Sequence, residues 1–178
     1  MPVQLHDLHF DTYLSADTVA RQVENIAAAI SADYGDHPQP PVLLAVLNGA
    51  FVFAADLLRA MSLEAEISFV KLRSYNGTAS TGRVQELIGL THDLRGRDVI
   101  VVEDIVDSGE TLHQFLPELR AHGCASVRTA VLLVKPEALR HPLEFDYWGF
   151  EIENAFVVGY GLDYNELGRG LPGIWRRV

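Results

Sequence analysis

The chain has 178 residues, which is the length of one domain, and 48% of them are hydrophobic and 21% charged. These values are typical of a folded globular protein and exclude an intrinsically disordered chain. Fourteen basic residues against 24 acidic ones give a net charge of −10. That balance argues against nucleic acid or an anionic membrane as a partner, because both need a cationic surface, but it allows one small cationic pocket.

The cellular setting is predicted from what the sequence lacks. Cys124 is the single cysteine and cannot form an intrachain disulfide, so a reducing compartment is expected. Acids and histidines occupy the first residues where a secretory signal would be apolar, and no run of about 18 apolar residues predicts a membrane span. We therefore expect a cytoplasmic protein.

The elements alternate along the chain. The first predicted helix has Ser15 as its cap and apolar residues at helical spacing, and later apolar runs are bounded by glycine, proline and asparagine. In chain order we predict a helix over 16–32, a strand over 41–47, a helix over 51–61, a strand over 66–75, a loop over 76–83, strands over 84–90 and 98–102, a helix over 111–122, a strand over 126–136, and short strands over 145–152 and 155–160. This order predicts a single α/β domain with a mainly parallel twisted sheet flanked by helices.

Three carboxylates follow one of the buried strands. Glu103, Asp104 and Asp107 lie where a strand of an open α/β sheet ends, which is where such sheets bind ligands. Residues 108–111, Ser-Gly-Glu-Thr, then lead into a helix whose first N–H groups lack intrahelical partners. These donors, two hydroxyls and the helix dipole predict a phosphate site, and Gly109 lets the backbone approach the ligand closely.

Carboxylates beside a phosphate would repel it unless they bind something else. Ribose hydroxyls and Mg²⁺ are the chemically reasonable partners, since hard cations prefer oxygen ligands and bridge phosphates. The alternative is an ordinary strand-to-helix turn capped by Asp107 and Ser108, but capping does not require three acids. A P-loop is excluded, because the sequence contains no G-x-x-x-x-G-K-[ST].

The motif at residues 101–112, VVEDIVDSGETL, resembles the phosphoribosyl-diphosphate signature of type I phosphoribosyltransferases. Four further segments resemble the hypoxanthine-guanine branch of that family in order and spacing. They are LLAVLNGAFVFAADLL at 43–58, LRSYNGTASTG at 72–82, LLVKP at 132–136 and AFVVGYGLDYNELGR at 155–169. The resemblance covers roughly residues 40 to 178, and it implies a core at about 35–145 with a small hood from about 1–15 and 146–178.

The resemblance implies a role for each matching residue. Asp107 falls on the catalytic carboxylate beside purine N7. The predicted phosphoribosyl-diphosphate and nucleotide contacts are Asn48, Gly49, Ser74, Tyr75, Glu103, Asp104, Asp107, Ser108, Gly109, Glu110, Thr111 and Arg169. The predicted purine contacts are Lys135 at O6, Phe156 stacking on the base, Val157 through its backbone, and Asp163 near the 2-position. Mg²⁺ is the implied cofactor, with Glu103, Asp104 and Asp163 as its carboxylates.

Two positions depart from the family pattern. Asn48 stands where many members carry a basic residue, and the resemblance also implies a cis peptide before it. Glu110 adds negative charge to the phosphate loop. Both departures concern phosphate affinity and leave the reaction unchanged.

The residues alone leave simpler alternatives open. Lys135 could extend to solvent from the end of its strand, and Phe156 could be an ordinary core residue. Asp163 and Arg169 could form a surface ion pair that contributes little, and Asn48-Gly49 could be a plain turn.

The resulting prediction is a purine-salvage enzyme that converts a 6-oxopurine and phosphoribosyl diphosphate to a nucleoside monophosphate and diphosphate. One alternative is a transferase for another base, above all xanthine, and adenine is disfavoured because lysine only donates hydrogen bonds. Another is a nucleotide-binding regulator on the same fold, which would need a basic face. Nucleic acid and membranes are not expected partners, whereas the resemblance implies a homo-oligomer, either a dimer or a tetramer.

Overall fold

The computed structural model describes residues 2–73, 85–88 and 93–178. The helices are α1 (Ala16–Tyr34), α2 (Phe51–Ala60), α3 (Glu110–Ala121) and the short 3₁₀ helix η1 (Pro136–Ala138). The strands are β1 (Val3–Leu5), β2 (Leu8–Leu14), β3 (Val42–Leu47), β4 (Glu66–Arg73), β5 (Gln85–Ile88), β6 (Asp98–Val106), β7 (Ser126–Val134), β8 (Tyr147–Glu151), β9 (Val157–Val158) and β10 (Ile174–Arg177).

A six-stranded sheet in the order β5-β4-β3-β6-β7-β8 forms the centre of the molecule. The pairs from β4 to β8 are all parallel, and only β5 runs antiparallel to its neighbour β4. The apolar, β-branched runs of the sequence form the innermost strands, as expected for strands that are buried on both faces. The predicted α/β class with a mainly parallel sheet is confirmed.

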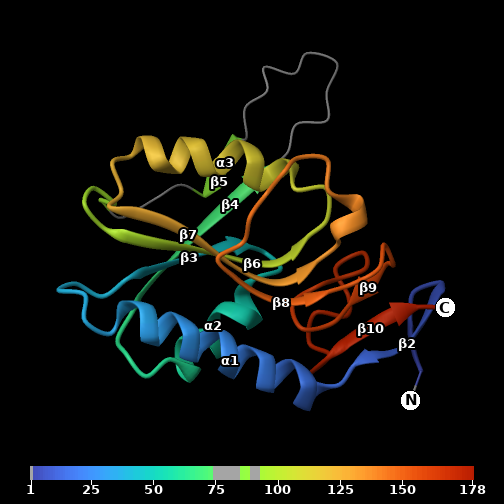
Figure 1. The fold of residues 1–178 in the computed structure, drawn as a ribbon. Coiled ribbons are helices and arrows are strands. Elements are labelled where there is room, and N and C mark those ends of the chain that lie inside the picture. Colours follow the sequence, from blue (N-terminus) through green and yellow to red (C-terminus); the bar gives the residue numbers. More distant parts are fainter. Residues whose placement is uncertain (1, 74–84, 89–92) are drawn as a thin grey trace.

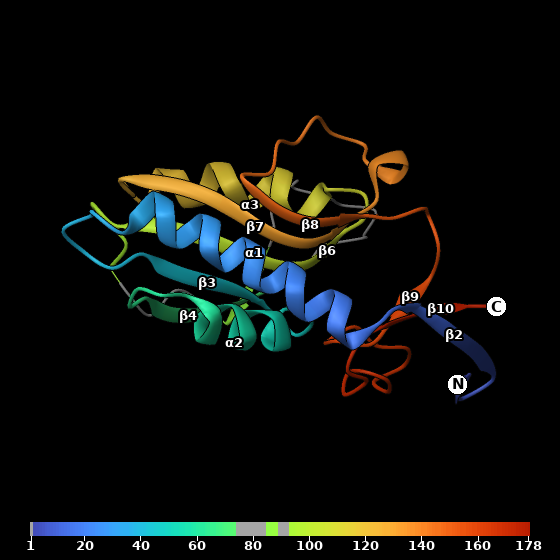
Figure 2. The same ribbon diagram turned by 60° about the horizontal axis from the view of Figure 1, so that its bottom comes forward.

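Helices cover both faces of this sheet (Figures 1 and 2). Helices α1 and α2 pack on one face, where Phe53, Leu57 and Ile30 are fully buried. Helix α3 packs on the other face through Phe115 and Leu119. The two apolar layers fix the strands between them, so the loops at the strand ends are held on a rigid scaffold.

Helix α1 follows from its local sequence. The Ser15 hydroxyl accepts a hydrogen bond from the Thr18 N–H at 3.2 Å, which is the predicted cap. The predicted apolar stripe is buried, and the helix continues two residues beyond the predicted end, to Tyr34. No helix in the described ranges is both long enough and apolar enough to cross a membrane.

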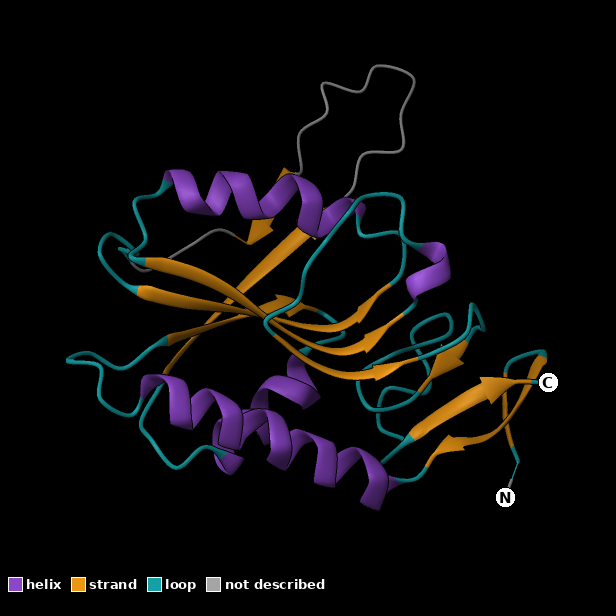
Figure 3. Cartoon of the chain, viewed as in Figure 1, coloured by secondary structure: helices purple, strands orange, loops and turns teal. Residues whose placement is uncertain are grey.

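A second sheet, in the order β1-β2-β10-β9, brings the two ends of the chain together (Figure 3). Its pairs are antiparallel, with Arg177 opposite Phe10 and Trp175 opposite Val158. Strands β1, β2 and β10 were not predicted from the sequence. Strand β8 lies in the range assigned to the hood but pairs with β7 of the main sheet, and the division into core and hood stays a prediction.

Candidate active site

The predicted site residues gather where the main sheet faces the small one. In Figure 3 the arrowheads of the central strands point toward the small sheet that carries both termini. In the β6–β7 register Val106 lies opposite Val134, so Asp107 and Lys135 leave the sheet side by side. The Lys135 N–H donates to the Val106 carbonyl at 3.0 Å, which fixes the two strand ends to each other.

Asp107 and Lys135 form an ion pair. The Lys135 Nζ lies 2.7 Å from Asp107 Oδ2, and the lysine side chain is 7% exposed while that of Asp107 is 57% exposed. The alternative in which Lys135 extends to solvent is therefore wrong. A buried ammonium needs a partner, and the carboxylate supplies it.

A cavity of about 340 Å³ opens at this pair. Phe156 contributes a half-exposed ring to it, so the core alternative for Phe156 is also wrong. Nine predicted residues line this cavity: Asn48, Gly49, Asp104, Asp107, Lys135, Phe156, Val157, Asp163 and Arg169. Ile105 and Leu162 line it as well, and neither was predicted, because apolar residues at strand and turn ends carry no distinctive signal in the sequence.

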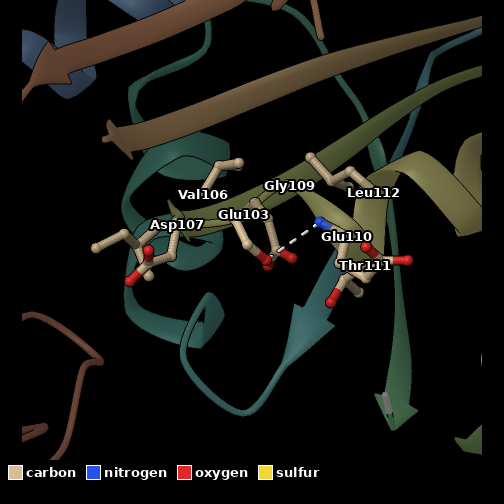
Figure 4. A pocket seen from close by; sticks show the side chains of 9 residues that line it. Glu103, Val106, Asp107, Gly109, Glu110, Thr111 and Leu112 are labelled. Atoms are coloured by element: carbon tan, nitrogen blue, oxygen red, sulfur yellow. Dashed lines mark hydrogen bonds between the residues drawn. The ribbon is translucent and has the colours of Figure 1, made fainter. Parts of the chain in front are cut away.

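A second cavity, of about 140 Å³, lies around the start of α3 (Figure 4). It is lined by the predicted residues Glu103, Asp107, Ser108, Gly109, Glu110 and Thr111, together with Ile105, Val106 and Leu112. Gly109 is the N-cap, with φ of 76°, and the Glu110 N–H donates to Ser108 Oγ at 3.4 Å. Asp107 and Ile105 line both cavities, which are therefore adjacent.

The negative charge of Glu110 has partners of its own. Its carboxylate accepts one hydrogen bond from Gln114, one turn along α3, and lies 2.7 Å from His141 Nε2. The hydrogen bond from His141, followed by that from Gln114, lowers the pKa of Glu110 below its usual range. The carboxylate therefore stays ionised and is held by neighbouring side chains.

Glu103 and Asp104 are buried neighbours on β6. Burial, followed by the Asp104 charge, raises the pKa of Glu103 well above its usual range. Burial raises the pKa of Asp104 to about 6, although backbone N–H groups and Arg169 oppose the rise. Two buried carboxylates without a compensating cation are costly, so this pair favours a cation or hydroxyl donors.

The loop after β3 packs directly on Asp104. The peptide between Leu47 and Asn48 is cis, as the resemblance implied. A Cβ at position 49 would overlap the Asp104 carboxyl group, so only glycine fits this position. Asn48-Gly49 is therefore part of the site wall and is more than a plain turn.

Arg169 extends across from the segment before β10. Its guanidinium lies 2.8 Å from Asp163 Oδ1 and donates to the Gly161 carbonyl at 2.8 Å. The Asp163–Arg169 ion pair is present, but it lies in the cavity wall with both side chains largely covered, so it is more than a surface pair.

The donors present fit magnesium. Within the described residues, no three His, Cys, Asp or Glu side chains are grouped so that they could hold a metal alone. Mg²⁺ usually takes one or two carboxylates and completes its shell with water and substrate phosphate. The buried pair Glu103–Asp104 and, separately, Asp163 offer such partial oxygen sites.

Two predicted residues cannot be placed. Ser74 and Tyr75 lie outside the described residues.

Known proteins are similar to this chain over most of its length. A family model described as the phosphoribosyl transferase domain matches residues 9–165. The chain belongs to this family. Its relatives place it in the hypoxanthine-guanine branch: the hypoxanthine-guanine phosphoribosyltransferase of Bacillus subtilis is 36% identical over 168 residues, which is 94% of this chain and 92% of that protein.

Other phosphoribosyltransferases are similar to the same extent. The Mycobacterium avium hypoxanthine-guanine enzyme is 40% identical over 163 residues, covering 89% of this chain and 80% of its own. The crystal structure of a Bacillus anthracis hypoxanthine-guanine phosphoribosyltransferase, with HEPES in its active site, superposes with a TM-score of 0.86 at 39% identity and covers 94% of this chain and 96% of its own.

Proposed function

We propose that this enzyme transfers the 5-phosphoribosyl group of phosphoribosyl diphosphate to hypoxanthine or guanine, giving IMP or GMP and diphosphate. One observation carries the proposal. The Lys135–Asp107 pair presents a donor and an acceptor 2.7 Å apart at the mouth of a cavity. A 6-oxopurine carries the matching acceptor and donor, O6 and the N7 hydrogen, on one edge of its ring.

The base specificity follows from these two groups. The ammonium of Lys135 can only donate, so it accepts a 6-oxo group and disfavours the 6-amino group of adenine. The half-exposed ring of Phe156 offers a face on which the base would stack, and Val157, which lines the same cavity, would contact the base through its backbone. Xanthine differs at the 2-position, where backbone groups and Asp163 lie, and is the competing substrate.

The sugar phosphate occupies the smaller cavity in this proposal. The 5′-phosphate accepts hydrogen bonds from the N–H groups at the start of α3 and from the hydroxyls of Ser108 and Thr111. Glu103 and Asp104 then face the ribose hydroxyls. Gly49 N–H and Arg169 stabilise the diphosphate, and Asn48 contributes no charge to this task.

Bond cleavage at C1′ gives the ribose oxocarbenium character and leaves a diphosphate anion. Catalysis therefore depends mainly on positioning and on electrostatic stabilisation of the leaving group. Glu103, Asp104 and Asp163 would hold Mg²⁺, which when bound neutralises charge on the diphosphate. Asp107 accepts the N7 proton as the new bond forms at N9.

The direct test is a base panel assayed with phosphoribosyl diphosphate and Mg²⁺. Hypoxanthine and guanine should both be converted, adenine should not, and EDTA should abolish turnover until Mg²⁺ is restored. Comparable rates with adenine would contradict the role of Lys135, and full activity in metal-free buffer would contradict that of the acids. Xanthine as the best substrate would support the competing assignment.

The cellular location and the oligomeric state of the enzyme are also proposals. A net charge of −10 and the single Cys124, which is free, support a cytoplasmic enzyme of small-molecule substrates. The family resemblance supports a homo-oligomer, whose size a sedimentation measurement would give.

A further inference from the structure

The segment that follows β9 has an unusual backbone. Gly159, Tyr160 and Gly161 have φ values of 101°, 50° and 100°, so three successive residues lie in the left-handed region. A tyrosine rarely adopts this conformation, and surrounding contacts must hold it there. The contacts of Tyr160 and Gly161 therefore indicate what the segment does.

Gly161 rests on the loop that follows β3. A Cβ at position 161 would overlap the carbonyl oxygen of Gly49, so the two backbones are in direct contact. Gly161 is also tied to Arg169, because its N–H donates to the Arg169 carbonyl at 2.9 Å and its own carbonyl accepts from the Arg169 guanidinium. One residue thus touches both groups that we assign to the diphosphate.

Tyr160 points the other way, into the apolar layer beneath α1 and α2. It is 5% exposed, and its hydroxyl donates to Asp56 Oδ2 on α2 at 2.7 Å. Helix α2 begins at Phe51, immediately after the loop that contains Gly49. The hydrogen bond therefore ties the segment carrying Gly161 to the same helix that the Gly49 loop leads into.

We propose that Tyr160 is a positioning residue for diphosphate. Its hydrogen bond to Asp56 keeps Gly161 against Gly49, and so holds the Arg169 guanidinium and the Gly49 N–H at a fixed separation across the cavity. The inference rests on the proposed function, because it assumes that these two groups bind the diphosphate of phosphoribosyl diphosphate.

The charges around Tyr160 agree with this role. Burial and then the hydrogen bond to Asp56 raise the pKa of the Tyr160 hydroxyl above its usual value. The hydroxyl is therefore a donor throughout the working pH range. Asp56 lies 3.6 Å from Arg59 on its other side, at the rim of an open cavity beside Glu24.

The chain contains a matched control. Tyr147 on β8 is buried in the same apolar layer, and its hydroxyl donates to Asp33 on α1 at 2.7 Å. It also accepts a hydrogen bond from Arg128 at 2.6 Å. Tyr147→Phe removes an equivalent buried hydroxyl without touching the segment next to Gly49.

The test compares Tyr160→Phe with Tyr147→Phe. Both should lower thermal stability, but only Tyr160→Phe should raise the Kd for diphosphate and the KM for phosphoribosyl diphosphate, by roughly three- to tenfold. The Kd for the product nucleotide, which lacks a diphosphate, should stay within about twofold for both variants. Asp56→Ala should reproduce the effect, and the double variant Tyr160→Phe/Asp56→Ala should be no worse than either single one.

Two outcomes overturn the inference. A diphosphate Kd that is unchanged in Tyr160→Phe shows that the hydroxyl does not position the site. Equal losses for diphosphate and nucleotide, or equal losses in Tyr147→Phe, show a merely structural role. If the wild-type protein itself fails to turn over phosphoribosyl diphosphate, the proposed function fails first, so the two failures are distinguishable.

Discussion

At the scale of single residues, Asp107 has two partners in turn. In the free protein it pairs with buried Lys135, and in the proposed reaction it accepts the N7 proton. The contact in the free protein prepares the reaction, because it holds the Lys135 side chain in place until the purine edge arrives. Lys135 is the buried member of the pair, so the position of Lys135 depends on Asp107 more than the position of Asp107 depends on Lys135.

Asp107→Asn should separate chemistry from binding. Asparagine keeps the shape of the side chain but loses the basic carboxylate, so kcat should fall by about 10²–10⁴-fold. The nucleotide Kd should change by no more than roughly tenfold, because the 5′-phosphate is bound by the loop that follows. Steady-state rates and nucleotide titrations measure both quantities.

Thr111→Ala is the converse control for that experiment. It removes one hydroxyl from the phosphate cavity and should weaken nucleotide binding by about 1–2 kcal/mol with a smaller effect on kcat. If Asp107 only caps the loop, its asparagine variant would keep nearly full kcat, since asparagine caps as well as aspartate.

At the scale of elements, the sequence predicted what is local and continuous. The cap and apolar stripe of α1, the buried strands β3, β6 and β7, and the acids at the carboxyl end of β6 all follow from short sequence patterns, although β6 runs on to Val106 and so includes Glu103 and Asp104. The small sheet did not follow, because its strands pair residues from opposite ends of the chain, such as Phe10 with Arg177. No local sequence pattern predicts that pairing.

The same reason limited the prediction of the site. Asp107, Ser108 and Thr111 belong to one motif, and the resemblance identified Lys135, Phe156 and Arg169 in others. The resemblance implied no role for Asp56, although it lies in a matching segment, and His141 lies outside all of them; Asp56 meets Tyr160, and His141 meets Glu110, only through folding. Contacts of high sequence separation such as these require the structure.

The loop between β3 and α2 gives a prediction at this scale. Gly49→Ala places a methyl group where the Asp104 carboxyl lies, so the loop or the carboxylate must move. We expect kcat/KM for phosphoribosyl diphosphate to fall by about 10²-fold, since a displacement of the order of 1 Å can cost that much. Gly170→Ala is the control, because a Cβ at that exposed position meets no atom within 4 Å. Equal activity of the two variants would contradict the close packing of the loop.

At the scale of the whole molecule, the site lowers the stability of the fold that carries it. Glu103 and Asp104 are buried side by side at the end of the central strand β6. A hydrophobic pair there would suit the surrounding sheet better, but it could bind neither ribose hydroxyls nor a cation. The apolar layers on both faces of the sheet supply the stability that this arrangement requires.

The loss of stability caused by the buried Asp104 carboxylate should depend on pH, and the direction of the change follows from its pKa. In the folded protein the pKa of Asp104 is raised from 3.8 to about 6. Between those values the folded state keeps a proton that the unfolded chain has released, so the free energy of unfolding decreases as the pH rises through this window. Other carboxylates contribute with the opposite sign, because hydrogen bonds to Tyr147 and Arg128 lower the pKa of Asp33. The comparison must therefore be a difference between variants.

Asp104→Asn isolates the contribution of this carboxylate. Asparagine is neutral at every pH, so the variant and the wild type should be about equally stable near pH 4, where Asp104 is protonated. By about pH 7.5 the variant should be more stable by roughly 2–3 kcal/mol, while its turnover is strongly reduced. Urea unfolding of both proteins in EDTA across this pH range measures the difference. If the difference in free energy of unfolding between the two proteins does not change with pH, burial of the ionised Asp104 carboxylate does not lower the stability of the fold. Adding Mg²⁺ should make this difference smaller, because the bound cation neutralises the carboxylate of the wild type.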